Sequence, residues 1–181
     1  MERADRYHRT AAEIHEVLDK LGLTSTKSWV LDFGCSVGFL MEGFEKLGYT
    51  NVFGYDASEW AGNLAMGKGL KMVRRVDDLY QIIIALDVFE HMEDLEITDT
   101  FYGMTNQVLI ARIPCARKGK TFYLESARKD DTHINCKNKS GWKKIFYRLG
   151  YKTVLHLNLY SIYDSDGVFS VMALRGDKIG Y

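Results

Sequence analysis

Four acidic side chains and one histidine stand where apolar segments of the chain end. They are Asp32, Asp56, Asp87, Glu90 and His91. A carboxylate beside a buried strand is unfavourable unless a cationic or hydroxyl-bearing group binds it. Ligands of open α/β sheets bind outside the carboxyl ends of the strands. These residues therefore predict a binding site at that edge, where a histidine, which titrates near neutral pH, could accept a proton.

The first of these acids opens a turn with two glycines. Residues 32–38 read Asp-Phe-Gly-Cys-Ser-Val-Gly and follow an apolar run. Glycine lets the backbone turn tightly and approach a ligand, and the free N–H groups of the next helix point at the same place. The turn is typical of a cofactor site, and its alternative is an ordinary turn between a strand and a helix.

Two nucleotide-binding patterns do not fit this turn. A dinucleotide fingerprint, G-x-G-x-x-G/A, needs glycine or alanine where the chain has Ser36 and Phe39. A P-loop needs a lysine after its last glycine, and none follows Gly38. The remaining pattern is D-x-G-x-x-x-G, with the acid before the glycines.

On these residues the sequence resembles the class I S-adenosylmethionine (SAM)-dependent methyltransferases of small molecules. Their first motif runs roughly V-L-D-x-G-C-G-x-G, against V-L-D-F-G-C-S-V-G at residues 30–38, and D-V-F-E-H at residues 87–91 is similar to their fourth motif. The resemblance spans residues from about 28 to 176. It implies SAM as the cofactor and S-adenosylhomocysteine (SAH) as the product.

The resemblance also assigns roles to individual residues. An acid at the end of a second strand binds ribose hydroxyls in doubly wound folds, so we expect this of Asp56; capping the next helix is its alternative role. Asp77, or else Asp78, is expected to contact adenine, with a solvated turn as the alternative. The predicted cofactor-binding residues are Asp32, Phe33, Gly34, Cys35, Gly38, Asp56, Ala57, Asp77, Asp78, Asp87 and Val88.

His91 and His133 are the predicted catalytic bases. A donor with an activated methyl group needs no covalent enzyme intermediate, only an aligned acceptor and removal of its proton. The predicted substrate contacts are Glu90, His91, His133 and Arg117. The alternative for each histidine is a purely structural hydrogen-bonding role.

A divalent metal is a further alternative. Asp87, Glu90, His91 and His133 resemble the Glu-x-x-Glu-His…His metal ligands of the small-RNA 2′-O-methyltransferases. Asp87 replaces the first Glu, and its shorter side chain reaches less far. We therefore expect no metal, and an activity that required magnesium would contradict this expectation.

The hydrophobic pattern predicts an α/β fold in which helices alternate with strands. We expect helices at about 3–21, 37–47, 58–66, 94–104 and 141–149, the last capped by Ser140. We expect strands at about 29–33, 52–55, 70–76, 80–86, 108–114, 153–160 and 168–175. The predicted fold is a doubly wound, mostly parallel seven-stranded sheet with a C-terminal antiparallel hairpin and helices on both faces. One domain, 1–181, would hold an N-terminal helical extension (1–27) and a core (28–176).

The amino-acid composition narrows the class of protein further. The 181 residues are 46% hydrophobic and 27% charged, as is usual for a globular protein. No apolar run reaches the length of a membrane span, and the first residues lack the apolar core of a signal peptide. The three cysteines form no C-x-x-C pair, which argues against structural zinc and a disulfide framework. We therefore expect a cytoplasmic protein without a membrane partner.

The net charge is zero, but residues 112–152 carry 12 Lys and Arg against 3 Asp and Glu. Such a segment is either a solvated face or a surface that meets an anion. The second reading favours an anionic small-molecule acceptor, such as a nucleotide-linked or phosphorylated sugar, or a quinone or polyketide precursor. One alternative is a nucleic-acid methyltransferase that uses this segment. Another is a non-catalytic cofactor-binding partner domain.

Overall fold

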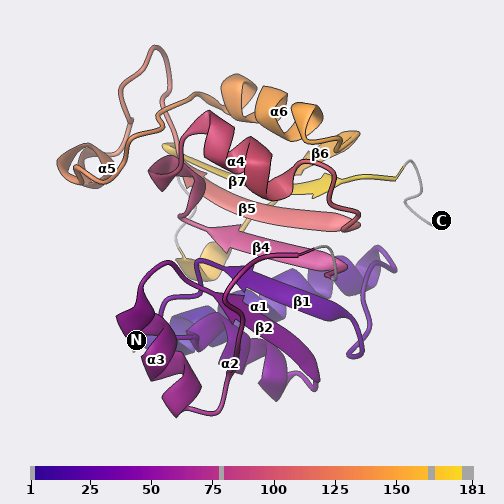
Figure 1. The fold of residues 1–181 in the computed structure, drawn as a ribbon. Coiled ribbons are helices and arrows are strands. Elements are labelled where there is room, and N and C mark those ends of the chain that lie inside the picture. The colour runs from indigo at the N-terminus through magenta and orange to yellow at the C-terminus, as the bar shows by residue number, and fades with distance from the viewer. Residues whose placement is uncertain (1–2, 78–79, 163–165, 177–181) are drawn as a thin grey trace.

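A computed structural model describes residues 3–77, 80–162 and 166–176. One seven-stranded sheet crosses the molecule in the order β3-β2-β1-β4-β5-β7-β6 (Figure 1). The strands are β1 Trp29–Phe33, β2 Asn51–Tyr55, β3 Lys71–Met72, β4 Ile82–Leu86, β5 Val108–Pro114, β6 Thr153–His156 and β7 Val168–Leu174. Strands β1 to β5 pair in parallel, and β7 pairs antiparallel with both β5 and β6. The predicted mostly parallel sheet with a C-terminal antiparallel hairpin is confirmed.

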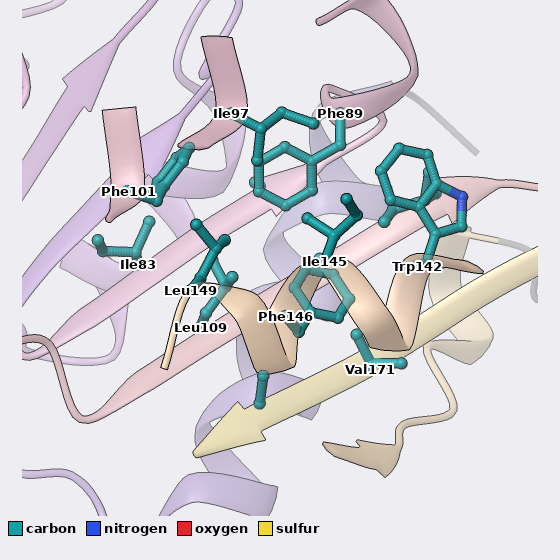
Figure 2. Close-up of a cluster of buried hydrophobic side chains, with 14 of the residues drawn as sticks. Ile83, Phe89, Ile97, Phe101, Leu109, Trp142, Ile145, Phe146, Leu149 and Val171 are labelled. Atoms are coloured by element: carbon teal, nitrogen blue, oxygen red, sulfur yellow. The ribbon is translucent and has the colours of Figure 1, made fainter. Parts of the chain in front are cut away.

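Helices cover both faces of the sheet because the strands are apolar on both sides. The helices are α1 Arg3–Lys20, α2 Phe39–Lys46, α3 Glu59–Gly67, α4 Asp94–Phe101, α5 Glu125–Lys129 and α6 Lys139–Arg148, with 3₁₀ turns η1 Phe89–His91 and η2 Tyr160–Ile162. Ile83 and Ala85 of β4 face the cluster under α4 and α6, which Figure 2 shows. Ile82 and Ile84 face the cluster under α1 and α2. Since side chains alternate along a strand, Asp32 shares the α1/α2 face with Val30.

Four local predictions are wrong. The third strand, expected at about 70–76, is only the two-residue β3 Lys71–Met72. Helix α6 begins at Lys139 with Asn138 as its N-cap, whose side chain accepts from Gly141 N at 2.8 Å. Ser140 therefore lies inside the helix instead of capping it. Residues 125–129 form helix α5, although the hydrophobic pattern predicts no helix between 104 and 141. Strand β6 ends at His156 instead of Tyr160, since η2 turns toward α1, where Glu13 accepts hydrogen bonds from Ser161.

None of the helices in the described ranges combines the length and the apolar composition that a bilayer crossing requires.

Candidate active site

The turn between β1 and α2 has the tight backbone that its glycines predict. Gly34 and Gly38 have φ of 80° and 84°, and Ser36 lies in the same left-handed region at 51°. The amides of Gly34 and Cys35 both donate to the carbonyl of Tyr55, at 2.7 and 3.0 Å. These two hydrogen bonds hold the turn against the end of β2, so residues 20 and 21 positions apart share one edge of the sheet.

Asp56 connects the β1–α2 turn to the residues that follow β2. One carboxylate oxygen accepts from Ser36 N at 2.7 Å and the other from Ser58 N at 2.8 Å. The alternative role of capping α3 is wrong, because Ser58 is the N-cap and accepts from Ala61 N. A carboxylate has about four lone-pair sites, so Asp56 keeps acceptor capacity for ribose hydroxyls. Its ribose contact stays a prediction.

Asp32 is a buried carboxyl group that forms no ion pair in the described parts of the chain. It is 4% exposed, and its Oδ2 has no hydrogen-bond partner among the described residues. Burial, with a smaller contribution from the charge of Asp56, raises its pKa from the ordinary 3.8 to about 8. A cation beside it would reverse this shift. SAM carries positive charge on its sulfonium and its ammonium group, so the site fits the predicted cofactor.

Replacing Asp32 with Asn should stabilise the cofactor-free protein at alkaline pH. Because the folded pKa of Asp32 is raised, the folded state holds a proton that the unfolded state releases between about pH 4 and pH 8. The free energy of unfolding of the native protein therefore falls as pH rises through this window. Urea unfolding at pH 8 should show Asp32→Asn more stable by roughly 1–3 kcal/mol, with little difference near pH 4.

The same substitution should weaken SAH binding, because it removes the carboxylate that is predicted to meet the cofactor's positive charge. Asp131→Asn, on an exposed loop residue, is the control and should change neither property. If the free energy of unfolding depends on pH equally in the native protein and in Asp32→Asn, the raised pKa of Asp32 is contradicted.

A large cavity, about 650 Å³, runs along the carboxyl edge of the sheet. Of the predicted cofactor residues, those lining it are Phe33, Gly34, Asp56, Ala57, Asp87 and Val88. Asp32, Gly34 and Cys35 line a smaller cavity beside it. Gly38 instead packs tightly: a Cβ there would lie 2.2 Å from Leu70 Cδ1. These residues therefore gather at one edge, and their individual cofactor contacts stay predictions.

Asp77, the residue predicted to contact adenine, does not line this cavity. Val76 lines the wall, whereas Asp77 Oδ1 is buried with no hydrogen-bond partner among the residues that the structure describes. Asp78 lies outside the described residues. The sequence reasoning missed other wall residues, namely Ser36, Tyr55, Arg74, Arg75, Met92, Glu96, Asp99 and Thr100. Ser36 and Tyr55 are adjacent to the motifs and could have been found, but the α4 residues depend on helix packing.

The 3₁₀ turn η1 holds the predicted catalytic group. Asp87, just before it, has φ of 57° and forms an ion pair with Arg112 of β5. Glu90 is fully buried, and neither carboxylate oxygen has a hydrogen-bond partner within the described parts of the chain. Burial, with the charge of Asp87 second, raises the pKa of Glu90 to about 9. Its carbonyl accepts from Ile134 N and Asn135 N, both at 2.9 Å, which fixes the 132–135 loop to η1.

This contact brings the two predicted bases together, with ring centroids 4.6 Å apart. His91 Nδ1 lies 3.2 Å from the Thr132 carbonyl and 3.0 Å from its hydroxyl, and His91 lines the large cavity. A proton on Nδ1, donated to that carbonyl, leaves Nε2 as a base. His133 Nδ1 lies 3.0 Å from the Ala127 carbonyl, and its Nε2 lies 3.6 Å from Asp130 Oδ2. His133 is not among the cavity-lining residues.

Glu90, His91 and His133 also form a candidate metal-binding group. Their potential ligand atoms lie within 4.8 Å of one another, and a carboxylate with two imidazoles suits several divalent ions. Asp87, the fourth residue of the sequence hypothesis, is instead engaged by Arg112. The expected absence of a metal stays a prediction.

Arg117, the fourth predicted substrate contact, lies elsewhere. It pairs with Asp166 at 2.7 Å and stacks over Tyr123 at 4.5 Å. It lines a separate cavity of about 420 Å³ with Lys139 and Ser140, which shares no residue with the large one.

Comparison with known proteins bears on this site. A sequence model of a family described as a methyltransferase domain matches residues 3–156, and no curated protein matches the chain. Magnesium protoporphyrin IX methyltransferase from Synechocystis PCC 6803 with bound SAM aligns with a TM-score of 0.65 at 17% identity, covering 94% of this chain and 80% of that one.

Two further solved structures share the fold. A SAM-dependent methyltransferase from Archaeoglobus fulgidus aligns with a TM-score of 0.65 at 15% identity, covering 91% of this chain and 94% of that one. The methyltransferase domain of bacterial CtHen1-CN aligns with a TM-score of 0.63 at 15% identity, covering 92% and 97%. By its family match, its fold and its motif-bearing edge, this chain belongs to the methyltransferase domain family and is a SAM-dependent class I methyltransferase.

Proposed function

We propose that this methyltransferase acts on an oxygen or nitrogen atom of a small molecule, with His91 as the base. SAM supplies a methyl group already activated by its sulfonium. The chain must hold that group in line with the acceptor and remove the acceptor's proton. The observation that carries the proposal is the place of His91 on the wall of the cavity that Gly34 and Asp56 also line.

The chemistry of each residue suits the role that we propose for it. Asp56 accepts hydrogen bonds from hydroxyls, and Asp32 offsets positive charge. Thr132 holds the proton of His91 on Nδ1, so Nε2 stays available to the acceptor. The buried carboxyl of Glu90 keeps its proton at neutral pH because its pKa is raised to about 9. It therefore adds no second negative charge beside Asp87.

His91→Asn should lower kcat by about 10²-fold or more, the usual contribution of a general base. Methyl transfer would be followed by SAH release with a panel of hydroxyl- and amine-bearing metabolites. The acid limb of the pH–rate profile should also disappear, which a structural role would not cause. His156→Asn, on the exposed end of β6, is the matched control and should match the native enzyme.

Several results would overturn the proposal. If SAH does not bind the native protein, the cofactor assignment fails. If SAH binds and no metabolite is methylated, a cofactor-binding partner domain is the better account. An unchanged pH–rate profile in His91→Asn would remove His91 from the chemistry.

An anionic acceptor stays a prediction, because the large cavity has no lining residue from the basic segment 112–152. That segment instead supports a second candidate, methylation of nucleic acid. Lys143, Lys144 and Arg148 lie on the exposed side of α6. Transfer of labelled methyl to RNA or DNA, with affinity falling steeply as salt rises, would favour this candidate over a metabolite.

A further inference from the structure

The imidazole of His91 contacts two oxygen atoms of one residue in the loop that follows α5. Its Nδ1 lies 3.0 Å from the Thr132 hydroxyl and 3.2 Å from the Thr132 carbonyl. The carbonyl can only accept a hydrogen bond, whereas the hydroxyl can either donate to His91 or accept from it. The direction of the shorter contact therefore depends on where the hydroxyl proton of Thr132 goes.

The carboxylate of Asp130 takes that hydroxyl proton as a hydrogen bond. Asp130 Oδ1 accepts from the Thr132 hydroxyl at 2.5 Å and from Thr132 N at 3.0 Å. A carboxylate is ionised at neutral pH and has no proton to donate. The Thr132 hydroxyl must therefore donate to Asp130, and only its lone pairs remain for His91. The proton between His91 and Thr132 then has to come from the ring, which places it on Nδ1.

The second oxygen of Asp130 forms no comparable bond. Oδ2 lies 3.6 Å from His133 Nε2, which is too far for a hydrogen bond. Asp130 is therefore hydrogen-bonded to Thr132 and only close to His133, and its strongest influence passes through Thr132 to His91.

The loop is attached to the turn that carries His91 by other bonds as well. The carbonyl of Glu90 accepts from Ile134 N and Asn135 N, both at 2.9 Å. The side-chain amide of Asn135 donates to the Met92 carbonyl at 2.8 Å. These contacts lie on both sides of His91 in the sequence, so they hold the loop beside the ring without any help from the Asp130 carboxylate.

We propose that Asp130 is a positioning residue, which acts through the Thr132 hydroxyl to keep the proton of neutral His91 on Nδ1. This inference rests on the proposed role of His91 as the base and adds the group that fixes its tautomer. The lone pair of Nε2 is then free to take the proton that the acceptor loses. The imidazolium that forms keeps its Nδ1–H bond to Thr132, next to the negative charge of Asp130.

The test is long-range ¹H–¹⁵N NMR of the full chain, which shows which ring nitrogen carries the proton. The His91 signals are identified by their absence in His91→Asn, near pH 8, where a histidine with the ordinary pKa of about 6.5 is neutral. Native His91 should show a protonated Nδ1 and an unprotonated Nε2. Asp130→Ala frees the Thr132 hydroxyl to donate to Nδ1. The tautomer ratio should then shift toward Nε2–H by roughly 10-fold, about the worth of one hydrogen bond, and the two nitrogen signals should move toward each other.

Two further variants separate this role from a general effect on the loop. Asp130→Asn keeps an oxygen that can accept from Thr132, so it should keep the native His91 signals. Asp131→Ala removes the exposed carboxylate of the next residue and should keep them too. With a metabolite that the SAH-release panel shows to be methylated, Asp130→Ala alone should lower kcat, by roughly 10-fold, with its KM unchanged.

Three results would overturn the proposal. Native His91 could carry its proton on Nε2, or its signals could be the same in Asp130→Ala as in the native protein. Asp130→Ala could also lose affinity for SAH in calorimetry, which would mean that Asp130 supports the shape of the site instead. The NMR measurement needs no acceptor, whereas the role of His91 as the base fails only in the His91→Asn assay. The failure of this inference and that of the proposed function are therefore distinguishable.

Discussion

Gly34→Ala is expected to lower the affinity for SAH by at least about 30-fold. A left-handed backbone costs an L-residue roughly 1–2 kcal/mol, and Gly34 has φ of 80°. A Cβ there would also lie 2.4 Å from Val88 Cγ2, and overpacking typically costs about 1–3 kcal/mol. The turn must move away from Val88 to relieve both the backbone strain and the close contact. Both residues line the large cavity, so the movement would disrupt the binding surface, and every 1.4 kcal/mol is about tenfold in affinity.

Gly103→Ala is the matched control for this experiment. Gly103 has φ of 81°, but a Cβ there would meet nothing within 4 Å. It lies in the connection between α4 and β5 and does not line the large cavity. The control should lose about 1–2 kcal/mol of unfolding free energy and bind SAH normally. If both variants bind SAH like the native protein, close packing of Gly34 on Val88 is not needed for binding.

Phe89→Ala is expected to lower the free energy of unfolding by about 3–5 kcal/mol, as is usual for a buried phenylalanine. Phe89 is fully buried, and its ring lies 5.4 Å from that of Phe101, 6.4 Å from Trp142 and 6.1 Å from Phe146. Figure 2 shows Phe89 among side chains of α4 and α6. Removing the ring would leave a cavity beneath both helices. Urea unfolding with linear extrapolation measures the change.

The loss should extend to activity, because Phe89 begins the η1 turn that carries Glu90 and His91. Tyr102→Ala removes an aromatic ring that is 69% exposed, and its stability should stay within about 0.5 kcal/mol of the native value. A loss below about 1 kcal/mol in Phe89→Ala would mean that the core does not depend on this ring.

Sequence reasoning succeeded where a local pattern has one physical solution. Strands β1 and β5 have the predicted bounds, Trp29–Phe33 and Val108–Pro114, since short β-branched and aromatic runs between turn residues strongly favour strands. It failed where several local solutions compete. Asn138 and Ser140 are both good N-caps, and only the packed position of α6 selects the first.

The gathering of Asp32, Asp56, Asp87 and His91 at one edge could be predicted, because parallel strands end at the same side of a sheet. Contacts between distant loops could not. His91 meets Thr132 across 41 residues, and Arg117, grouped with the site by its charge, lines a different cavity.

The sequence by itself determined the fold class and the motif-bearing edge, because hydrophobic period and glycine spacing act over a few residues. Only the tertiary structure decided which acidic groups there are buried and which are paired. Burial removes solvent from Asp32 and Glu90, and Arg112 reaches Asp87 from the neighbouring strand. Such pairings depend on through-space distances of a few ångströms between segments far apart in the chain, and those distances are set by packing.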